Sequence, residues 1–183
     1  MPIVPDDKNW TWVLERPCFD CGFDARSIEV ASLGDRVRAL AAEWPALLAR
    51  PDAALRPTGD QWSALEYACH VRDVFRLHTV RLGLMLAEDG ARFPNWDQDA
   101  TAIAERYDLQ DPATVADELL AAAAGNADLW DTVTQDMYGR TGFRSDGAAF
   151  TVVSFGTYFV HDPIHHLDDV RRGYAILADG QLD

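Results

Sequence analysis

Apolar residues recur every three to four positions in four long stretches of the chain, which is the spacing of helices that bury one face. The first stretch covers about residues 25–50, and Pro45 is expected to kink this helix or divide it in two. The second begins near Ser63, whose spacing from Glu66 fits a capping box, and it extends to about Glu88.

Two further helices are expected in the second half of the chain. Asp111 and Pro112 form an N-cap and first-turn pair, and the Ala- and Leu-rich pattern behind them continues to about Thr134. A glycine-containing loop then leads to the fourth helix, at about residues 150–177, with Pro163 inside it. Four long helices, with short strands at most, predict an all-α four-helix bundle of the up-down type with one long connection.

A single domain over residues 1–183 is expected, because 183 residues at 48% hydrophobic content can bury one core. Residues 1–24 lack helical periodicity and are expected to form an irregular arm fastened by Trp10, Trp12 and Phe19. The chain has no apolar run long enough to span a membrane, and its first eight residues do not have the pattern of a signal peptide. These features favour a cytoplasmic protein without membrane association.

The charge of the chain argues against nucleic-acid binding. Thirty acidic residues outnumber 16 basic ones, and the formal net charge of −14 repels phosphate backbones. Lys8 is the only lysine beside fifteen arginines, a bias that suggests a high-GC genome.

Three of the five histidines fall within the six residues His161-Asp162-Pro163-Ile164-His165-His166. His161 and His165 lie four residues apart, so on a helix both rings project from one face and can converge on one ion. His70, in the second helix, is the best candidate for a third ligand. Three neutral imidazoles would leave coordination positions open, which is the pattern of catalytic rather than structural metal sites. The alternative is a pair of histidines on a polar helix face.

The two remaining histidines are weaker ligand candidates. His166 points about 100° away from His165, toward solvent, a supporting group or a neighbouring helix. His78 is expected to be structural. Replacing His70 or His165 by Ala should therefore abolish metal binding, whereas replacing His166 or His78 should not.

Cys18 and Cys21 form a lone Cys-x-x-Cys motif. It resembles half of a zinc knuckle, but structural zinc needs four ligands and no second such motif follows. A reducible disulfide or a plain thiol pair is the alternative. Cys69 is expected to pack in the core, and the odd number of cysteines argues against a secreted disulfide framework.

Residues 93–99 concentrate aromatic and carboxylate side chains between helices, where a bundle would line the mouth of a pocket. Trp96, Asp97 and Asp99 are therefore candidate substrate-binding residues. The alternative is a capped turn, in which Asp side chains accept from helix amides. A short helical segment is expected after this linker, at about residues 100–106.

Charged residues beside the proposed ligands are candidates for supporting roles. Arg72 and Arg76 share one helix face and could bind a substrate carboxylate, or they could pair with the acidic surface. Asp73 and Asp169 follow the proposed ligands on their helices by three and four residues, a spacing that suits hydrogen bonds to those ligands.

The pattern Trp62-Ser63-x-x-Glu66-x-x-x-His70, together with His161-x-x-x-His165, resembles the DinB/YfiT-like superfamily of metal-dependent enzymes. The resemblance covers most of the chain. It implies a four-helix bundle with a divalent metal, most often zinc or nickel, on His70, His161 and His165. From this resemblance we also expect a homodimer.

Several members of that superfamily use small thiols, among them mycothiol-dependent maleylpyruvate isomerase and bacillithiol transferases. The resemblance therefore implies a thiol S-transferase, which takes a small thiol and a small-molecule electrophile. Metal coordination removes the proton of a thiol and so makes it nucleophilic at neutral pH. The high-GC composition favours mycothiol as the thiol. Two alternatives stay open: a metal-dependent hydrolase that activates water, and a non-catalytic binding bundle stabilised by metal.

Overall fold

The computed structural model describes residues 9–180. Residues 1–8, on which the signal-peptide prediction falls, and residues 181–183 lie outside the described part. The first bundle helix consists of two pieces, α1 (Leu33–Ala41) and α2 (Trp44–Leu48). Pro45 stands in the first turn of α2, where its missing N–H leaves no intrahelical bond unmade, so the proline begins a new helix as expected.

The other three bundle helices are α3 (Ala64–Ala87), α5 (Pro112–Asp131) and α6 (Val152–Asp179). The capping box predicted for α3 is present, because Ser63 accepts from the Glu66 backbone N–H and the Glu66 carboxylate accepts from the Ser63 N–H. Arg56 pairs with the same carboxylate, which keeps the buried Glu66 charge compensated. This end of α3 is thereby fixed one turn before His70.

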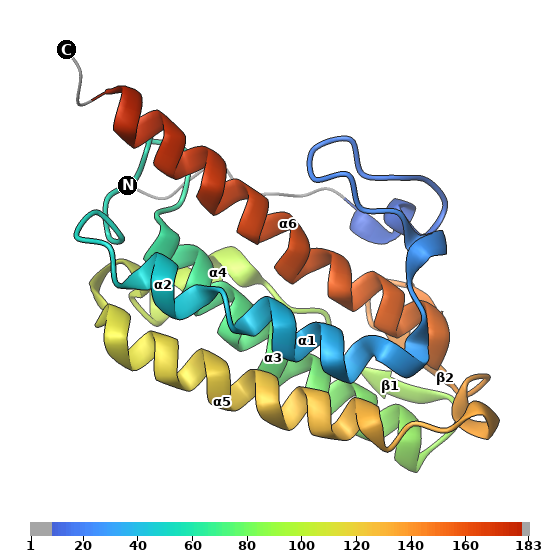
Figure 1. The fold of residues 1–183 in the computed structure, drawn as a ribbon. Helices are drawn as coiled ribbons and strands as arrows, with labels where there is room; N and C mark the ends of the chain where they lie inside the picture. The colour runs from blue at the N-terminus through green and yellow to red at the C-terminus, as the bar shows by residue number, and fades with distance from the viewer. Residues whose placement is uncertain (1–8, 181–183) are drawn as a thin grey trace.

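The four helices pack in the ring order α1, α5, α3, α6, as Figure 1 shows. The predicted four-helix bundle is confirmed. Its long connection is residues 88–111, which returns the chain to the end at which α3 began and carries the short helix α4 (Gln98–Ala104). As a result α3 and α5 run parallel: Arg72 bonds Glu118, and two turns later Thr79 accepts from Asn126.

A three-stranded sheet, which was not specifically predicted, lies at one end of the bundle. The parallel pair β1 (Ala91–Phe93) and β2 (Thr141–Arg144) joins Arg92 to Phe143, and β3 (Ala149–Thr151) pairs antiparallel with β2. The sheet ties the long connection to the segment before α6. It thereby brings Arg144 beside the residues that follow β1.

Buried apolar side chains form one continuous cluster between the helices, with Trp44, Phe75, Phe155 and Phe159 among its largest members. Buried polar residues instead concentrate where α3 faces α6. That seam contains His70, His78 and Arg81, whereas His161 and His165 are buried on another side of α6, against the arm. Among the described residues, none of the helices combines the length and apolar character needed to cross a membrane.

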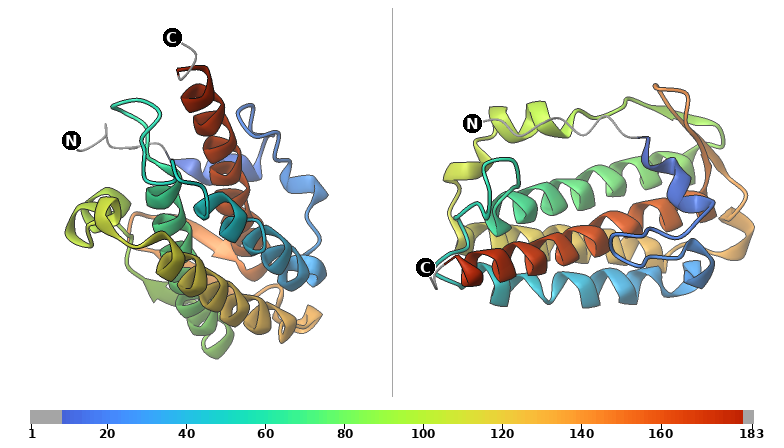
Figure 2. Two further views of the ribbon diagram at one scale, coloured as in Figure 1. Left: turned by 60° about the vertical axis from the view of Figure 1, so that its left-hand side comes forward. Right: turned by 90° about the horizontal axis from the view of Figure 1, so that it is seen from above.

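The described part of the N-terminal arm folds back against α6, as Figure 2 shows from above. It begins with the short 3₁₀ turn Trp10–Leu14. Val13, Cys18 and Phe23 are the buried anchors, with Trp10 and Trp12 stacked on each other at 5.6 Å between ring centroids. Phe19 was expected to be an anchor, but this was wrong: it is 88% exposed, because it projects from the tip of a tight loop.

Candidate metal centres

Helix α6 carries two interleaved pairs of metal-binding side chains. His161 and His165 form one pair, and Asp162 and His166 form the other, each with a spacing of four residues. Because the second pair is displaced by one residue, it faces a direction about 100° away from the first. The two pairs therefore meet different parts of the molecule. Pro163 lies between them inside a continuous helix and leaves one backbone carbonyl without its intrahelical donor.

The first group, here called the inner cluster, consists of His70, Asp162 and His166. One ligand atom from each residue lies within 4.8 Å of the others. The His70 Nε2 atom is 3.3 Å from the Asp162 carboxylate oxygen Oδ2, and the His166 Nε2 atom is 3.8 Å from that same oxygen. The three groups thus converge across the seam between α3 and α6.

Asp169 sets the orientation of His166. The His166 Nδ1–H donates to Asp169 Oδ2 at 2.8 Å, which directs the Nε2 lone pair toward the inner cluster. Arg172 in turn donates to the other oxygen of Asp169 at 2.5 Å. A carboxylate behind a histidine in this way fixes the tautomer of histidines that bind metals.

Aromatic side chains enclose His70. Its ring stacks on Trp96 at 5.4 Å with an interplanar angle of 12°, and Trp62 lies 5.6 Å away on another side. The His70 side chain is fully buried. These contacts hold the ring rigidly, so its position relative to α6 is determined by packing.

The inner cluster has the donors and the charge that a divalent metal requires. Burial raises the pKa of Asp162, but His70 and His166 lower it further, so the net pKa lies below its usual value and the carboxylate is ionised. Asp162 Oδ1 is buried without a hydrogen-bond partner among the described residues. Two imidazoles and one carboxylate are the ligand set of known catalytic zinc sites, and they leave further coordination positions open. The residues present therefore fit a divalent metal.

The second group, the outer cluster, joins the arm to α6. It consists of Cys18, Cys21, His161 and His165, whose ligand atoms also lie within 4.8 Å of one another. Burial, and then the neighbouring His165, lower the pKa of His161 to about 4, so this imidazole is neutral at pH 7. The three cysteines of the chain, Cys69 among them, are free thiols, and Cys69 is buried in the core as expected.

The predicted set of three histidines is thus divided between two clusters. His70 belongs to the inner cluster, whereas His161 and His165 belong to the outer one. The side of α6 that faces α3 runs through Phe155, Phe159, Asp162 and His166, at helical spacing. His166, which was expected to be dispensable, therefore lies next to His70, with ring centroids 4.8 Å apart.

Of the two candidate supporting carboxylates, Asp169 lies 3.7 Å from His165, as its spacing suggested, and also bonds His166, whereas Asp73 has other partners. Asp73 accepts from Tyr107 at 2.5 Å and from Arg72 at 2.9 Å and does not bond His70. Arg72 and Arg76 both pair with Glu118, at 2.9 and 3.1 Å. Their charges are therefore used in an ion-pair network between α3 and α5, which is the second of the two roles considered for them.

A cavity of about 790 Å³ adjoins both clusters. The linker residues expected at a pocket mouth, Trp96, Asp97 and Asp99, do line it. Asp97 also accepts from the Ala100 backbone N–H at 2.9 Å as the N-cap of α4, so the linker is a capped turn as well as a pocket wall. The short helix expected near residues 100–106 corresponds to α4.

Arg81 and His78 line the part of this cavity next to the sheet, where sequence reasoning gave them no binding role. The Arg81 side chain donates to the Pro94 carbonyl at 2.7 Å, but its Nε atom is buried without a partner, and it forms no ion pair within residues 9–180. Burial, and then the charge of Arg144, lower the pKa of Arg81 to about 10, so it remains protonated at pH 7. The spacing of His70, His78 and Arg81 places them on one face of α3, so the two cavity residues could have been linked to His70 from the sequence.

His78 is held as a neutral ring. Its Nδ1–H donates to the Val74 carbonyl at 2.9 Å, and burial lowers its pKa to about 3. Its Nε2 atom is buried and has no hydrogen-bond partner among residues 9–180. The structure therefore presents an acceptor at His78 and an unneutralised cation at Arg81 on the same cavity.

The fold and the site together define a four-helix bundle with a histidine-rich candidate metal centre at one cavity wall. Among solved structures the chain is similar to YfiT from Bacillus subtilis, described as a probable metal-dependent hydrolase with an unusual four-helix bundle topology. The TM-score is 0.67 at 19% identity, over 79% of this chain and 87% of that chain. At this identity the likeness establishes the fold. No protein-family model and no curated protein sequence matches the chain.

Proposed function

We propose that the protein is a metal-dependent enzyme that transfers a small thiol to an anionic small-molecule electrophile. The observation that carries the proposal is the inner cluster: His70, Asp162 and His166 converge at the wall of a large cavity, with Asp169 behind His166. A divalent metal bound there, zinc or nickel, would lower the pKa of a thiol or water that coordinates it. The similarity in fold to a probable metal-dependent hydrolase supports dependence on a metal.

The chain's own residues have three tasks in such a reaction. Asp169 keeps the His166 Nε2 lone pair available, and Asp162 supplies one negative charge against a divalent cation. Trp62 and Trp96 exclude water from His70 and keep the ring in place. The cavity, at about 790 Å³, has the volume typical of sites that hold one drug-sized ligand or two smaller molecules side by side.

At one part of the cavity wall, a buried arginine supports an anionic substrate. A buried cation without a counterion is costly, and Arg81 has no carboxylate partner among the described residues. A substrate carboxylate would supply that partner, and a substrate hydroxyl or amide could donate to His78 Nε2. Arg144 lines the same wall, but its charge is paired with Asp146 at 2.8 Å, and it also bonds the Tyr158 hydroxyl at 3.1 Å.

The choice of a thiol over water as nucleophile rests on the two carboxylates that contact the inner-cluster histidines. Hydrolysis by metal-activated water usually needs a nearby general base. Asp162 is one of the proposed ligands, and Asp169 is already bonded to both His166 and Arg172. A coordinated thiol needs no such base, because coordination itself favours loss of its proton. Mycothiol is the proposed thiol on the sequence composition and the superfamily resemblance.

One experiment tests the reaction type. Protein loaded with zinc or nickel is incubated with monomethyl fumarate, which carries one carboxylate, one ester and one electrophilic double bond, with and without mycothiol. We expect protein-dependent loss of free thiol as the S–C bond forms and a proton is delivered to carbon. Thiol-independent release of acid from the ester would instead identify a hydrolase. Binding of the metal with neither reaction would favour a non-catalytic bundle.

The role of Arg81 gives a separate prediction. Arg81→Gln should raise KM for monomethyl fumarate at least about tenfold, because it removes the buried cation, and it should leave KM for the neutral dimethyl ester within about twofold. Steady-state kinetics with both esters measures the difference. Arg92→Gln, at an exposed position on β1, is the control and should change neither value. Equal effects of Arg81→Gln on the two esters would remove the argument for an anionic substrate.

A further inference from the structure

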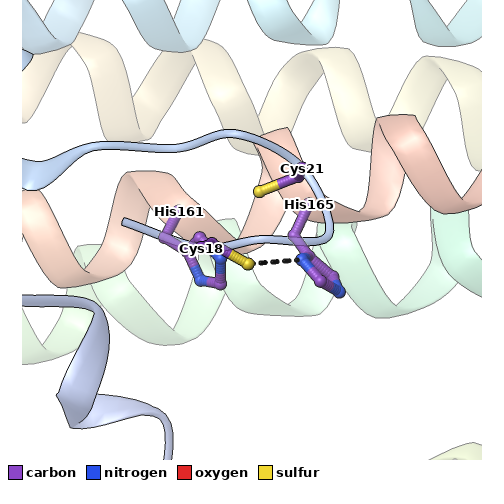
Figure 3. Close-up of side chains that lie close together, drawn as sticks. All are labelled: Cys18, Cys21, His161 and His165. Atoms are coloured by element: carbon purple, nitrogen blue, oxygen red, sulfur yellow. Dashed lines mark hydrogen bonds between the residues drawn. The ribbon is translucent and has the colours of Figure 1, made fainter. Parts of the chain in front are cut away.

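Two motifs that are about 140 residues apart in sequence meet on the outer side of α6. Cys18 and Cys21 come from the arm, and His161 and His165 come from successive turns of the helix. Figure 3 shows the two thiols and the two imidazoles turned toward a common point, with Cys18 Sγ in contact with the His165 ring. Each motif alone supplies half of a metal site. Together they supply four ligands.

The distances within the outer cluster match those around a tetrahedral metal. Zinc bonds of about 2.3 Å to sulfur and about 2.0 Å to nitrogen separate adjacent S and N ligands by about 3.5 Å in a tetrahedral site. The Cys18 Sγ atom is 3.7 Å from His165 Nδ1, and all four ligand atoms lie within 4.8 Å of one another. A cation could therefore be bound with only small side-chain movements.

The backbone around the cysteines is arranged as a tight loop that turns both thiols to one side. The Gly22 N–H donates to the Cys18 carbonyl at 2.9 Å, and the Cys18 N–H donates to the Phe23 carbonyl at 2.8 Å. Gly22 has φ +73°, a left-handed conformation that favours glycine. The Phe23 backbone N–H also bonds the Cys21 thiol, as backbone amides do for sulfurs that bind metals.

The outer cluster is largely shielded from solvent, and one of its ligand atoms has no hydrogen-bond partner among the described residues. Cys18, His161 and His165 are 1%, 4% and 9% exposed. The rings of Trp10 and Phe23 cover the histidines, with Phe23 5.0 Å from His161. His161 Nε2 is buried and has no hydrogen-bond partner among residues 9–180. On the far side of His165, Nε2 faces Asp169 Oδ2 at 3.7 Å, a carboxylate behind a histidine again.

We propose that Cys18, Cys21, His161 and His165 form a structural zinc site, separate from the inner cluster. Two thiolates and two imidazoles in a tetrahedral arrangement are a zinc-type ligand set, and four protein ligands leave no position for a substrate. Binding releases the two thiol protons to solvent, so the site keeps no net charge from zinc and its ligands. The inference does not depend on the reaction proposed for the inner cluster.

The position of the proposed zinc site indicates which part of the protein it would stabilise. The arm residues Trp10 and Asp20 line the cavity, and the arm crosses α6 beside the inner cluster. A zinc ion that binds both the arm and α6 would fix this cavity wall. Structural zinc contributes directly to the free energy of folding of the segments it joins.

Metal analysis of the purified protein tests the site. Protein dialysed against zinc should contain two zinc ions per chain, one at each cluster. Replacement by Co²⁺ should give an intense sulfur-to-cobalt charge-transfer band in the near ultraviolet, because only the outer cluster contains thiolates. A cobalt-loaded wild-type protein without this band would overturn the proposal, even if every cysteine variant failed to fold. A Cys18–Cys21 disulfide found by mass spectrometry in freshly reduced, zinc-loaded protein would also overturn it.

Variants assign the band to the residues. Cys21→Ser should abolish the charge-transfer band or weaken it strongly, remove one zinc per chain, and increase hydrogen exchange in the peptide over residues 9–24. Phe19→Ala is the matched control, because Phe19 lies in the same loop, is exposed and carries no ligand atom. It should leave all three measurements unchanged. Retention of two zinc ions and of the full band by Cys21→Ser would contradict the proposal.

Discussion

Replacement of His166 by Ala is expected to remove the metal ion from the inner cluster while the outer cluster keeps its zinc. The substitution deletes one of three ligands and leaves the Asp162 carboxylate with only His70 as a partner. Loss of a group that merely supports a ligand costs about 10- to 100-fold in metal affinity, so loss of the ligand should cost more than about 100-fold. Competition with a chromophoric chelator would measure the affinity, and total zinc should fall from two ions per chain to one.

His161→Ala is the matched comparison, since this residue also lies on α6, one turn before His165. It should lose the outer ion and retain the inner one, together with any activity that the inner ion supports. The three-histidine assignment made from sequence predicts the opposite: His161→Ala would lose the catalytic metal and His166→Ala would keep it. The two variants therefore decide between the assignments, whatever the reaction is.

The sequence was sufficient to predict the bundle because each helix carries local signals. The Ser63 and Glu66 capping box, the Asp111-Pro112 start and the apolar spacing are all determined within one or two turns. The sheet lacked such signals, since β1 and β3 have only three residues each and pair with a strand distant in sequence. Their pairing depends on how the long connection returns the chain to the start of α5.

The sequence pointed to the residues of the two candidate metal centres, but not to the grouping that the structure gives them. His161 and His165, and Asp162 and His166, have the same spacing, so spacing alone does not say which pair faces α3. The rotation of α6 about its axis decides which pair faces α3. The bulky Phe155 and Phe159 pack against α3, and the same helix face continues to Asp162 and His166. Extending that apolar stripe along the helix selects Asp162 and His166 as the pair nearest to His70.

The outer cluster shows a second limit of local reasoning. The Cys18-x-x-Cys21 motif indicates half of a zinc site, and no second pair of cysteines follows it in the sequence. Zinc accepts imidazole as readily as thiolate, and the helical His161-x-x-x-His165 pair was already on the chain. The two halves were not combined because the contact between the arm and α6 is a tertiary one, without periodicity in the arm.

The position of α6, and with it both clusters, depends on close packing at Gly156. A Cβ atom at this position would lie 2.5 Å from Leu33 Cδ1 and 2.6 Å from Trp130 Cη2, well inside van der Waals contact. Trp130 itself stacks on Phe159 at 6.4 Å, so its ring has little freedom to move away. Gly156 therefore allows α6 to approach α1 and α5 more closely than any other residue would permit.

Gly156→Ala should accordingly lower the free energy of unfolding by about 1–3 kcal/mol, the usual cost of overpacking a filled core. Gly125→Ala is the control, since Gly125 is exposed within α5 and a Cβ there meets nothing within 4 Å. It should raise the free energy by about 0.5–1 kcal/mol through helix propensity. Urea unfolding with a chelator present keeps metal binding out of both values. If Gly156→Ala were as stable as wild type, α6 would have room to shift, and the alignment of Asp162 and His166 with His70 would not be fixed by packing.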